Sequence, residues 1–211
     1  MIPVTPKPEP STFDQQVRQP GSAFLSKVAR PTTKEWSNHR YWGRSLQDLW
    51  TSYDGICAYC CCWIPRDTGI ATVDHFLPKS EDPTLAYEWE NFRLASLKMN
   101  SRKGTYTDVL DPFSVQSGWF HIRFPSLLIS PNGALPSETI TSIQQTIRRL
   151  RLNEEPLVKS RLAWIQPFCM KQTSFDFLKR RAPFLAYEIE RQGLIHSLRD
   201  IYPTAKSSDK D

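Results

Sequence analysis

Glycine and long apolar runs are both scarce in this chain of 211 residues, which has 8 glycines against 17 prolines. No stretch approaches the ~18 uninterrupted apolar residues that a membrane-spanning helix needs. The sequence MIPVTPKPEP at its start has prolines where a signal peptide would have its apolar core. With 39% hydrophobic and 23% charged residues, the chain is too apolar to be disordered throughout and too polar for a membrane protein. These absences predict a cytoplasmic, globular protein.

The charge of the chain is weakly positive. It has 27 lysines and arginines against 22 aspartates and glutamates, which gives a formal net charge of +5. A basic surface suits an anionic partner such as a nucleic acid, but a bias of this size does not identify the partner.

The length of the chain fits one domain with flanking segments. Prolines are concentrated near the start, so residues 1–20 are predicted to form a flexible, proline-rich arm. Residues 21–205 are predicted to form a single domain, with a core at about residues 55–110 and a helical C-terminal part. Residues 206–211 are polar and are predicted to be a tail.

Hydrophobic patterns predict two short strands and a helix near the middle of the chain. Residues 70–75 and 91–95 are predicted strands, separated by a long loop with two prolines. Ser96 is a predicted N-cap of a helix that ends at Gly104. Residues 118–129 favour strands, and the last third favours helices, since Ile140, Ile143, Ile147 and Leu150 keep a helical period.

The residues with a chemical signature lie between Thr72 and Gly104. An Asp74-His75 pair ends the first predicted strand, Asn91 begins the second strand, and Asn100 lies on the helix after it. Each of these residues alone is a weak signal, since an Asp-His dipeptide or a lone Asn is usually structural. Their joint order of strand, loop, strand and helix is more specific.

This pattern resembles the HNH, or ββα-metal, endonuclease motif in its Asp-His…Asn…Asn form, and Pro78 and Lys103-Gly104 extend the likeness. The resemblance implies an α+β fold in which a ββα-metal core is embedded in N- and C-terminal helices. It also implies a metal-dependent endonuclease that hydrolyses phosphodiester bonds of DNA or RNA with one Mg²⁺ or Mn²⁺ ion.

The resemblance assigns a role to each residue of the motif. Asp74 and Asn100 would bind the metal through oxygen atoms, which Mg²⁺ and Mn²⁺ prefer. His75 would be the general base that activates a water molecule, since neutral imidazole can accept a proton near pH 7. Asn91 would hold the loop that bears His75 through side-chain hydrogen bonds.

Basic residues surround the motif. Between Asn91 and Thr107 the chain has basic residues and no acidic one. A basic segment beside the metal would receive a phosphate backbone. The predicted nucleic-acid contacts are Lys79, Arg93, Arg102 and Lys103, whereas Lys98 fits a solvated helix face equally well.

Four of the five cysteines lie within six positions: Cys57, Cys60, Cys61 and Cys62. Many HNH proteins bind a structural zinc with two Cys-x-x-Cys pairs, and Cys57 and Cys60 form such a pair here. The second pair would fall at Ser96 and Met99, which supply no thiolate. Burial of the cysteines as small apolar residues is therefore favoured over a structural zinc.

A second resemblance lies outside the motif. The sequences LDPF at 110–113 and ETITSIQQTIRRLRLNEEPLVKSR at 138–161 resemble a subgroup of bacterial HNH proteins. In that subgroup the nuclease accompanies an ATPase of the ABC/SMC type in anti-phage defence, as in Septu and some retron systems. The alternatives are a non-catalytic nucleic-acid-binding module and an interaction subunit of an ATPase complex.

Overall fold

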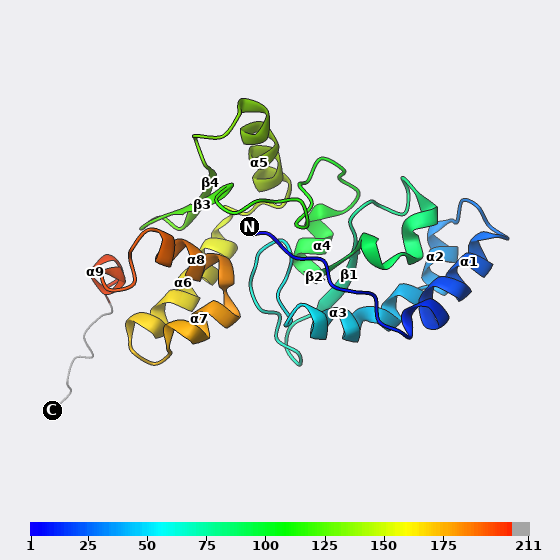
Figure 1. The fold of residues 1–211 in the computed structure, drawn as a ribbon, viewed down its shortest axis with the longest axis horizontal. Helices are drawn as coiled ribbons and strands as arrows, with labels where there is room; N and C mark the ends of the chain where they lie inside the picture. The colour runs from blue at the N-terminus through cyan, green and yellow to red at the C-terminus, as the bar shows by residue number, and fades with distance from the viewer. Residues whose placement is uncertain (204–211) are drawn as a thin grey trace.

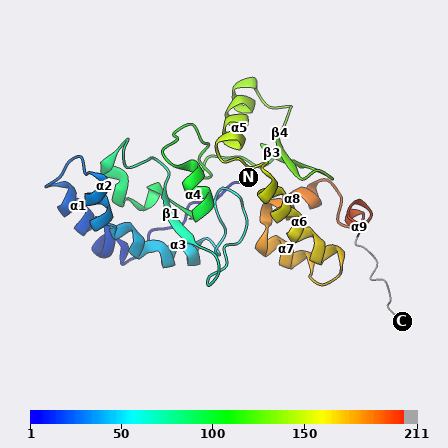
Figure 2. The ribbon, with the colours of Figure 1, turned by 180° about the vertical axis from the view of Figure 1, so that it is seen from behind.

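The computed structural model describes residues 1–203 and shows three groups of elements along the molecule. Short helices of the N-terminal part lie at one end, two strands and a helix lie next to them, and the C-terminal helices lie at the other end (Figures 1 and 2). The N-terminal elements are a π-helix at Asp14–Arg18, α1 (Gln19–Leu25), α2 (Thr33–Asn38), a 3-10 helix at Tyr41–Ser45 and α3 (Leu46–Ser52).

The centre of the molecule is a two-stranded antiparallel sheet followed directly by a helix. Strands β1 (Ala71–His75) and β2 (Phe92–Ser96) pair so that Asp74 lies opposite Arg93. Ser96 caps α4 (Leu97–Lys103), because its side chain accepts a hydrogen bond from the backbone N–H of Met99. Gly104 ends the helix with a φ of +49°, which favours glycine. The predicted order of strand, loop, strand and capped helix is confirmed.

The loop between the two strands is partly ordered by short helices. Two 3-10 helices occupy Pro83–Tyr87 and Trp89–Asn91, where the sequence predicts only a loop. Asp82 begins the first of them, since its carboxylate accepts a hydrogen bond of 2.9 Å from the backbone N–H of Thr84. Such local side-chain caps give a short irregular segment a fixed path.

The C-terminal part combines a hairpin with helices. The predicted strand region forms β3 (Phe120–Arg123) and β4 (Leu128–Pro131), and the predicted helical region is helical. Its apolar stripes are buried, as at Ile143, Ile165 and Ile189. The helices are α5 (Ser137–Arg149), α6 (Glu155–Cys169), α7 (Phe175–Arg181), α8 (Pro183–Arg191) and α9 (Leu198–Ile201).

The N-terminal segment corrects the expectation of a flexible arm over residues 1–20. Its first part has the extended path that its prolines predict, but it packs along the protein. Phe13 and Val17 are almost completely buried, and the indole N–H of Trp89 donates a hydrogen bond of 2.8 Å to the carbonyl of Lys7. Apolar side chains between the prolines anchor the segment, so the arm belongs to the folded unit.

The architecture is α+β, as predicted, with small antiparallel sheets and many helices. Among residues 1–203, no helix is long and apolar enough to cross a membrane. The predicted tail at 206–211 lies outside the described residues, as does the end of the predicted domain at residue 205.

Candidate functional site

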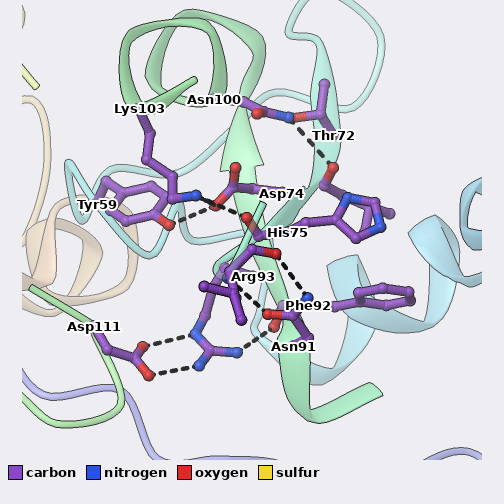
Figure 3. Close-up of polar contacts among 12 residues, drawn as sticks. Tyr59, Thr72, Asp74, His75, Asn91, Phe92, Arg93, Asn100, Lys103 and Asp111 are labelled. Carbon is purple, nitrogen blue, oxygen red and sulfur yellow. Dashed lines mark hydrogen bonds and ion pairs between the residues drawn. The ribbon is translucent and has the colours of Figure 1, made fainter. Parts of the chain in front are cut away.

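Three residues of the motif line one cavity of about 560 Å³: Asp74 and His75 at the end of β1, and Asn100 on α4. Successive residues of a strand point to opposite faces, so Asp74 and His75 project in different directions from one short segment (Figure 3). The third residue, Asn100, approaches from α4, which packs on both strands. Residues that are distant in the sequence therefore share one site.

Asp74 is a buried carboxylate with two partners on the same oxygen. Its Oδ2 accepts a hydrogen bond of 2.5 Å from the hydroxyl of Tyr59 and lies 3.8 Å from Nζ of Lys103 (Figure 3). Burial raises the pKa of Asp74 to about 6, although Lys103 and Tyr59 act to lower it. Because Oδ2 is engaged, Oδ1 is the oxygen left for a further ligand.

Lys103 is a fully buried lysine that connects the site to the fold. Its Nζ donates a hydrogen bond of 2.7 Å to the backbone carbonyl of His75 and lies close to Asp74. Burial lowers the pKa of Lys103, and the carboxylate of Asp74 acts in the opposite sense. The predicted role of Lys103 in phosphate contact is corrected, because its ammonium group is enclosed by the protein.

The imidazole of His75 is fixed in one tautomer. Its Nε2 lies 2.9 Å from the carbonyl oxygen of Ala86, which only accepts hydrogen bonds, so Nε2 carries the proton and Nδ1 carries the lone pair. Nδ1 lies 3.5 Å from Nζ of Lys79. Burial and the positive charge of Lys79 lower the pKa of His75 to about 3. The ring is therefore neutral over the physiological pH range.

Asn91 connects the two ends of the loop between β1 and β2. Its Oδ1 accepts a hydrogen bond of 2.8 Å from the backbone N–H of Leu77, and its Nδ2 donates to the carbonyls of Leu77 and Leu85 at 3.0 and 3.1 Å. The amide is buried, so each bond is shielded from water. Asn91 thus fixes the start of the loop at Leu77 and the backbone at Leu85, the residue before Ala86, whose carbonyl contacts His75.

Replacing Asn91 with alanine should lower the free energy of unfolding by about 2–4 kcal/mol, since part-buried backbone groups of Leu77 and Leu85 lose their partners. Urea unfolding monitored by circular dichroism measures this change. Asn132→Ala is the matched control, because the side chain of Asn132 makes one exposed hydrogen bond in a turn. Equal stability of the two variants would contradict the role of Asn91.

Asn100 is held against β1 through its amide nitrogen. Nδ2 donates to Oγ1 of Thr72 at 3.0 Å and to the carbonyl of Val73 at 3.3 Å (Figure 3). These bonds orient the amide, and among the described contacts Oδ1 is the atom left for another ligand. Asn100 and Asp74 therefore each line the cavity and each keep one side-chain oxygen outside the contacts described here.

Two predicted phosphate contacts are corrected by the structure. Arg93 is 3% exposed, pairs with both carboxylate oxygens of Asp111 at 2.7 and 2.8 Å, and stacks on the ring of Phe113. Arg102 donates to the carbonyls of Leu150 and Arg151 and forms an ion pair with Glu154. Both guanidinium groups are used inside the protein, so neither is available to a phosphate in this structure.

Lys79, a predicted nucleic-acid contact, lies at the candidate site. It lines the same cavity as Asp74 and His75, and its Nζ lies 4.6 Å from the centre of the Trp42 ring. Burial lowers the pKa of Lys79, and Asp74 raises it. Its amino group is the nearest cation to Nδ1 of His75 among the contacts of that ring.

Tyr59 is a residue of the site that the sequence does not reveal. It lies between Cys57 and Cys60 in the segment before β1, and its hydroxyl is the direct partner of Asp74. No spacing rule connects a tyrosine in a cysteine-rich turn to a carboxylate in a following strand. The burial of the ring, at 1% exposed, becomes apparent only in the folded chain.

Three of the five cysteines are buried, namely Cys57, Cys61 and Cys169, whereas Cys60 and Cys62 are half-buried. Cys57 and Cys61 are buried in the core, as the sequence favours, and burial raises the pKa of both thiols. Cys57 Sγ accepts a hydrogen bond from the backbone N–H of Ser96. Within residues 1–203, no group of three or more His, Cys, Asp or Glu side chains is arranged to hold a metal ion.

Comparison with known proteins gives one similar sequence to set beside this geometry. Over 94 residues, the chain is 34% identical to the Septu protein PtuB of Bacillus thuringiensis. The similar region covers 43% of this chain and 37% of the relative, so the chain spans little more than a third of the relative's length. No protein-family profile matches the chain.

Proposed function

We propose that this protein is a metal-dependent HNH endonuclease that hydrolyses phosphodiester bonds of nucleic acids. The observation that carries the proposal is the neutral imidazole of His75, whose Nδ1 lone pair lies beside Lys79, at a cavity that His75, Asp74 and Asn100 line together. A base, a carboxylate and a carboxamide oxygen on a strand–strand–helix unit are the groups that this reaction requires.

The donor atoms fit a divalent cation such as Mg²⁺ or Mn²⁺. Asp74 and Asn100 each present an oxygen, and the carboxylate of Asp74 is held in place by Tyr59 and Lys103. Two protein oxygens suffice for Mg²⁺, which usually retains several water ligands. When bound, the cation would supply charge neutralisation to the phosphate and to the departing oxygen.

The residues of the chain divide the remaining tasks. Nδ1 of His75 takes a proton from the attacking water, while the Nε2–H bond to Ala86 keeps the ring in the required tautomer. Lys79 lies within 3.5 Å of Nδ1, where it attracts the negative phosphate. An anionic phosphate near Lys79 offsets the charge that lowers the pKa of His75, and this makes the ring a stronger base when substrate is bound.

The biological role that we propose is that of an effector in anti-phage defence. The similarity to a Septu protein supports this role, together with the helical sequence at 138–161 that resembles the nucleases of such systems. In those systems the nuclease accompanies an ATPase of the ABC/SMC type. We therefore propose that a partner ATPase controls the activity of this chain.

Incubating the full-length protein with supercoiled plasmid and with bulk tRNA tests the proposed activity. We expect cleavage of at least one substrate with Mg²⁺ or Mn²⁺ and none with a chelator, both for the protein alone and in the presence of the proposed ATPase partner. Binding that depends steeply on salt, without cleavage under any of these conditions, would instead identify a non-catalytic module.

A further inference from the structure

Three neighbouring cavities at the candidate site share lining residues, and we call them together the trough. The central cavity, of about 560 Å³, shares Trp36 and Lys79 with a cavity of about 310 Å³ on one side. It shares Gly43 and Leu46 with a cavity of about 440 Å³ on the other side. The trough is built by α2, the 3-10 helix after it, α3 and the start of β1, which Figure 1 shows in one half of the molecule.

Basic side chains follow the trough along its whole length. Each of the three cavities has two of them among its lining residues: Arg30, Lys79, Arg40, Arg44 and Arg66, with Lys79 shared by two cavities. The acidic residues among these linings are Asp74, which belongs to the site itself, and Glu81. This distribution suits a polyanion that extends beyond a single phosphate in both directions.

Tryptophans lie between these basic residues. Trp36 is part of the wall that joins the first two cavities, and its half-buried ring lies on edge against the rings of Phe24 and Trp42. Trp50 lines the third cavity, with the guanidinium of Arg66 4.9 Å from its ring centre. Ile70, a 61% exposed apolar residue, lies on the wall of the same cavity.

From this arrangement we infer that the trough binds an unpaired nucleic acid strand, with the scissile phosphate at His75 and flanking bases on Trp36 and Trp50. The inference rests on the proposed endonuclease activity and specifies its substrate class. Alternating cations and aromatic rings are the features by which proteins bind single strands without reading their sequence, since every base has a face that stacks. A paired duplex hides those faces.

Equilibrium binding in the presence of a chelator, where cleavage is absent, tests this inference. The probe is a short, fluorescein-labelled oligonucleotide of mixed sequence, as DNA and as RNA, single-stranded or annealed to its complement. We expect tighter binding of the single strand in at least one of the two chemistries. The double variant Arg44→Glu/Arg66→Glu should weaken that binding by about tenfold or more. The slope of the logarithm of the binding constant against the logarithm of the salt concentration should become less steep by about 0.7 for each lost phosphate contact.

Arg180→Glu is the matched control, since Arg180 is exposed on α7 and lies outside the trough. Quenching of tryptophan fluorescence by the single strand reports stacking in the unaltered protein. Equal binding of duplex and single strand, or unchanged binding by the double variant, would overturn the trough while leaving plasmid or tRNA cleavage intact. Absence of both binding and cleavage would overturn the proposed activity as well.

Discussion

Replacing His75 with alanine is expected to reduce phosphodiester cleavage by about 10²- to 10⁴-fold, the range typical of a lost general base. The reason is the geometry of the ring, whose Nδ1 carries the lone pair beside Lys79 while Nε2 is bonded to Ala86. Alanine removes this lone pair and leaves Asp74 and Asn100 in place, so metal binding should be retained. Cleavage rates and calorimetric titration with Mn²⁺ measure the two properties separately.

His196→Ala provides the control for the loss of a histidine, because His196 is exposed and distant in sequence from the motif. Its cleavage rate should equal that of the unaltered protein. Unchanged cleavage by the His75 variant would refute the assigned base. A fall in cleavage together with a collapse of the circular dichroism spectrum would show that His75 supports the fold through its contacts with Trp42 and Phe92.

Replacing Asp74 with asparagine is expected to have opposite effects on activity and stability. Activity should fall by about 10²-fold or more, because one of the two protein oxygens proposed to hold the cation loses its charge.

In the unaltered protein, cleavage should rise as the pH increases through about 6, the pKa of the Asp74 carboxyl group, because the ionised form is the one that binds a cation. A cleavage–pH profile checks the second expectation.

Stability should increase in the same variant. Because burial raises the pKa of Asp74 from 3.8 to about 6, the folded protein binds this proton more tightly than the unfolded chain does. The resulting stabilisation is present below about pH 4 and is lost as the pH rises through about 6. Above that pH the ionised carboxylate costs up to about 3 kcal/mol, and asparagine removes this cost.

Thermal unfolding at about pH 8 and about pH 4 measures the change, which should be larger at the higher pH. Each kcal/mol corresponds to about 2–4 °C in a domain of this size. Asp108→Asn is a control of opposite sign, because Arg149 lowers the pKa of the exposed Asp108 and the native charge is therefore favourable. A lower melting temperature for the Asp74 variant at about pH 8 would contradict the cost assigned to its burial.

The strands and the helix of the central unit could be predicted because their signals are local. The β-branched residues before Asp74 favour a strand, and Ser96 and Gly104 have the usual chemistry of a helix start and a helix end. The order of Asp74, His75, Asn91 and Asn100 could be read in the same way, and their convergence follows from the topology.

The burial and pairing of the basic residues could not be predicted, because both depend on partners far along the chain. Arg93 pairs with Asp111, and Lys103 bonds to the carbonyl of His75, 28 positions before it. A lysine or arginine is normally exposed, so a pattern of charges suggests a surface. The arginines of the trough lie in segments where the sequence shows only short helices and turns, and only the fold brings them to neighbouring cavities at the candidate site.

The contacts of Arg102 connect the helix that bears Asn100 to the C-terminal part of the molecule. Arg102 lies on α4, and its guanidinium donates hydrogen bonds to the carbonyls of Leu150 and Arg151 just after α5. A shift of the C-terminal helices would therefore displace the side chain of Arg102, two residues from Asn100 on α4. The contacts of Arg102 therefore link the position of the C-terminal helices to the geometry of the candidate site.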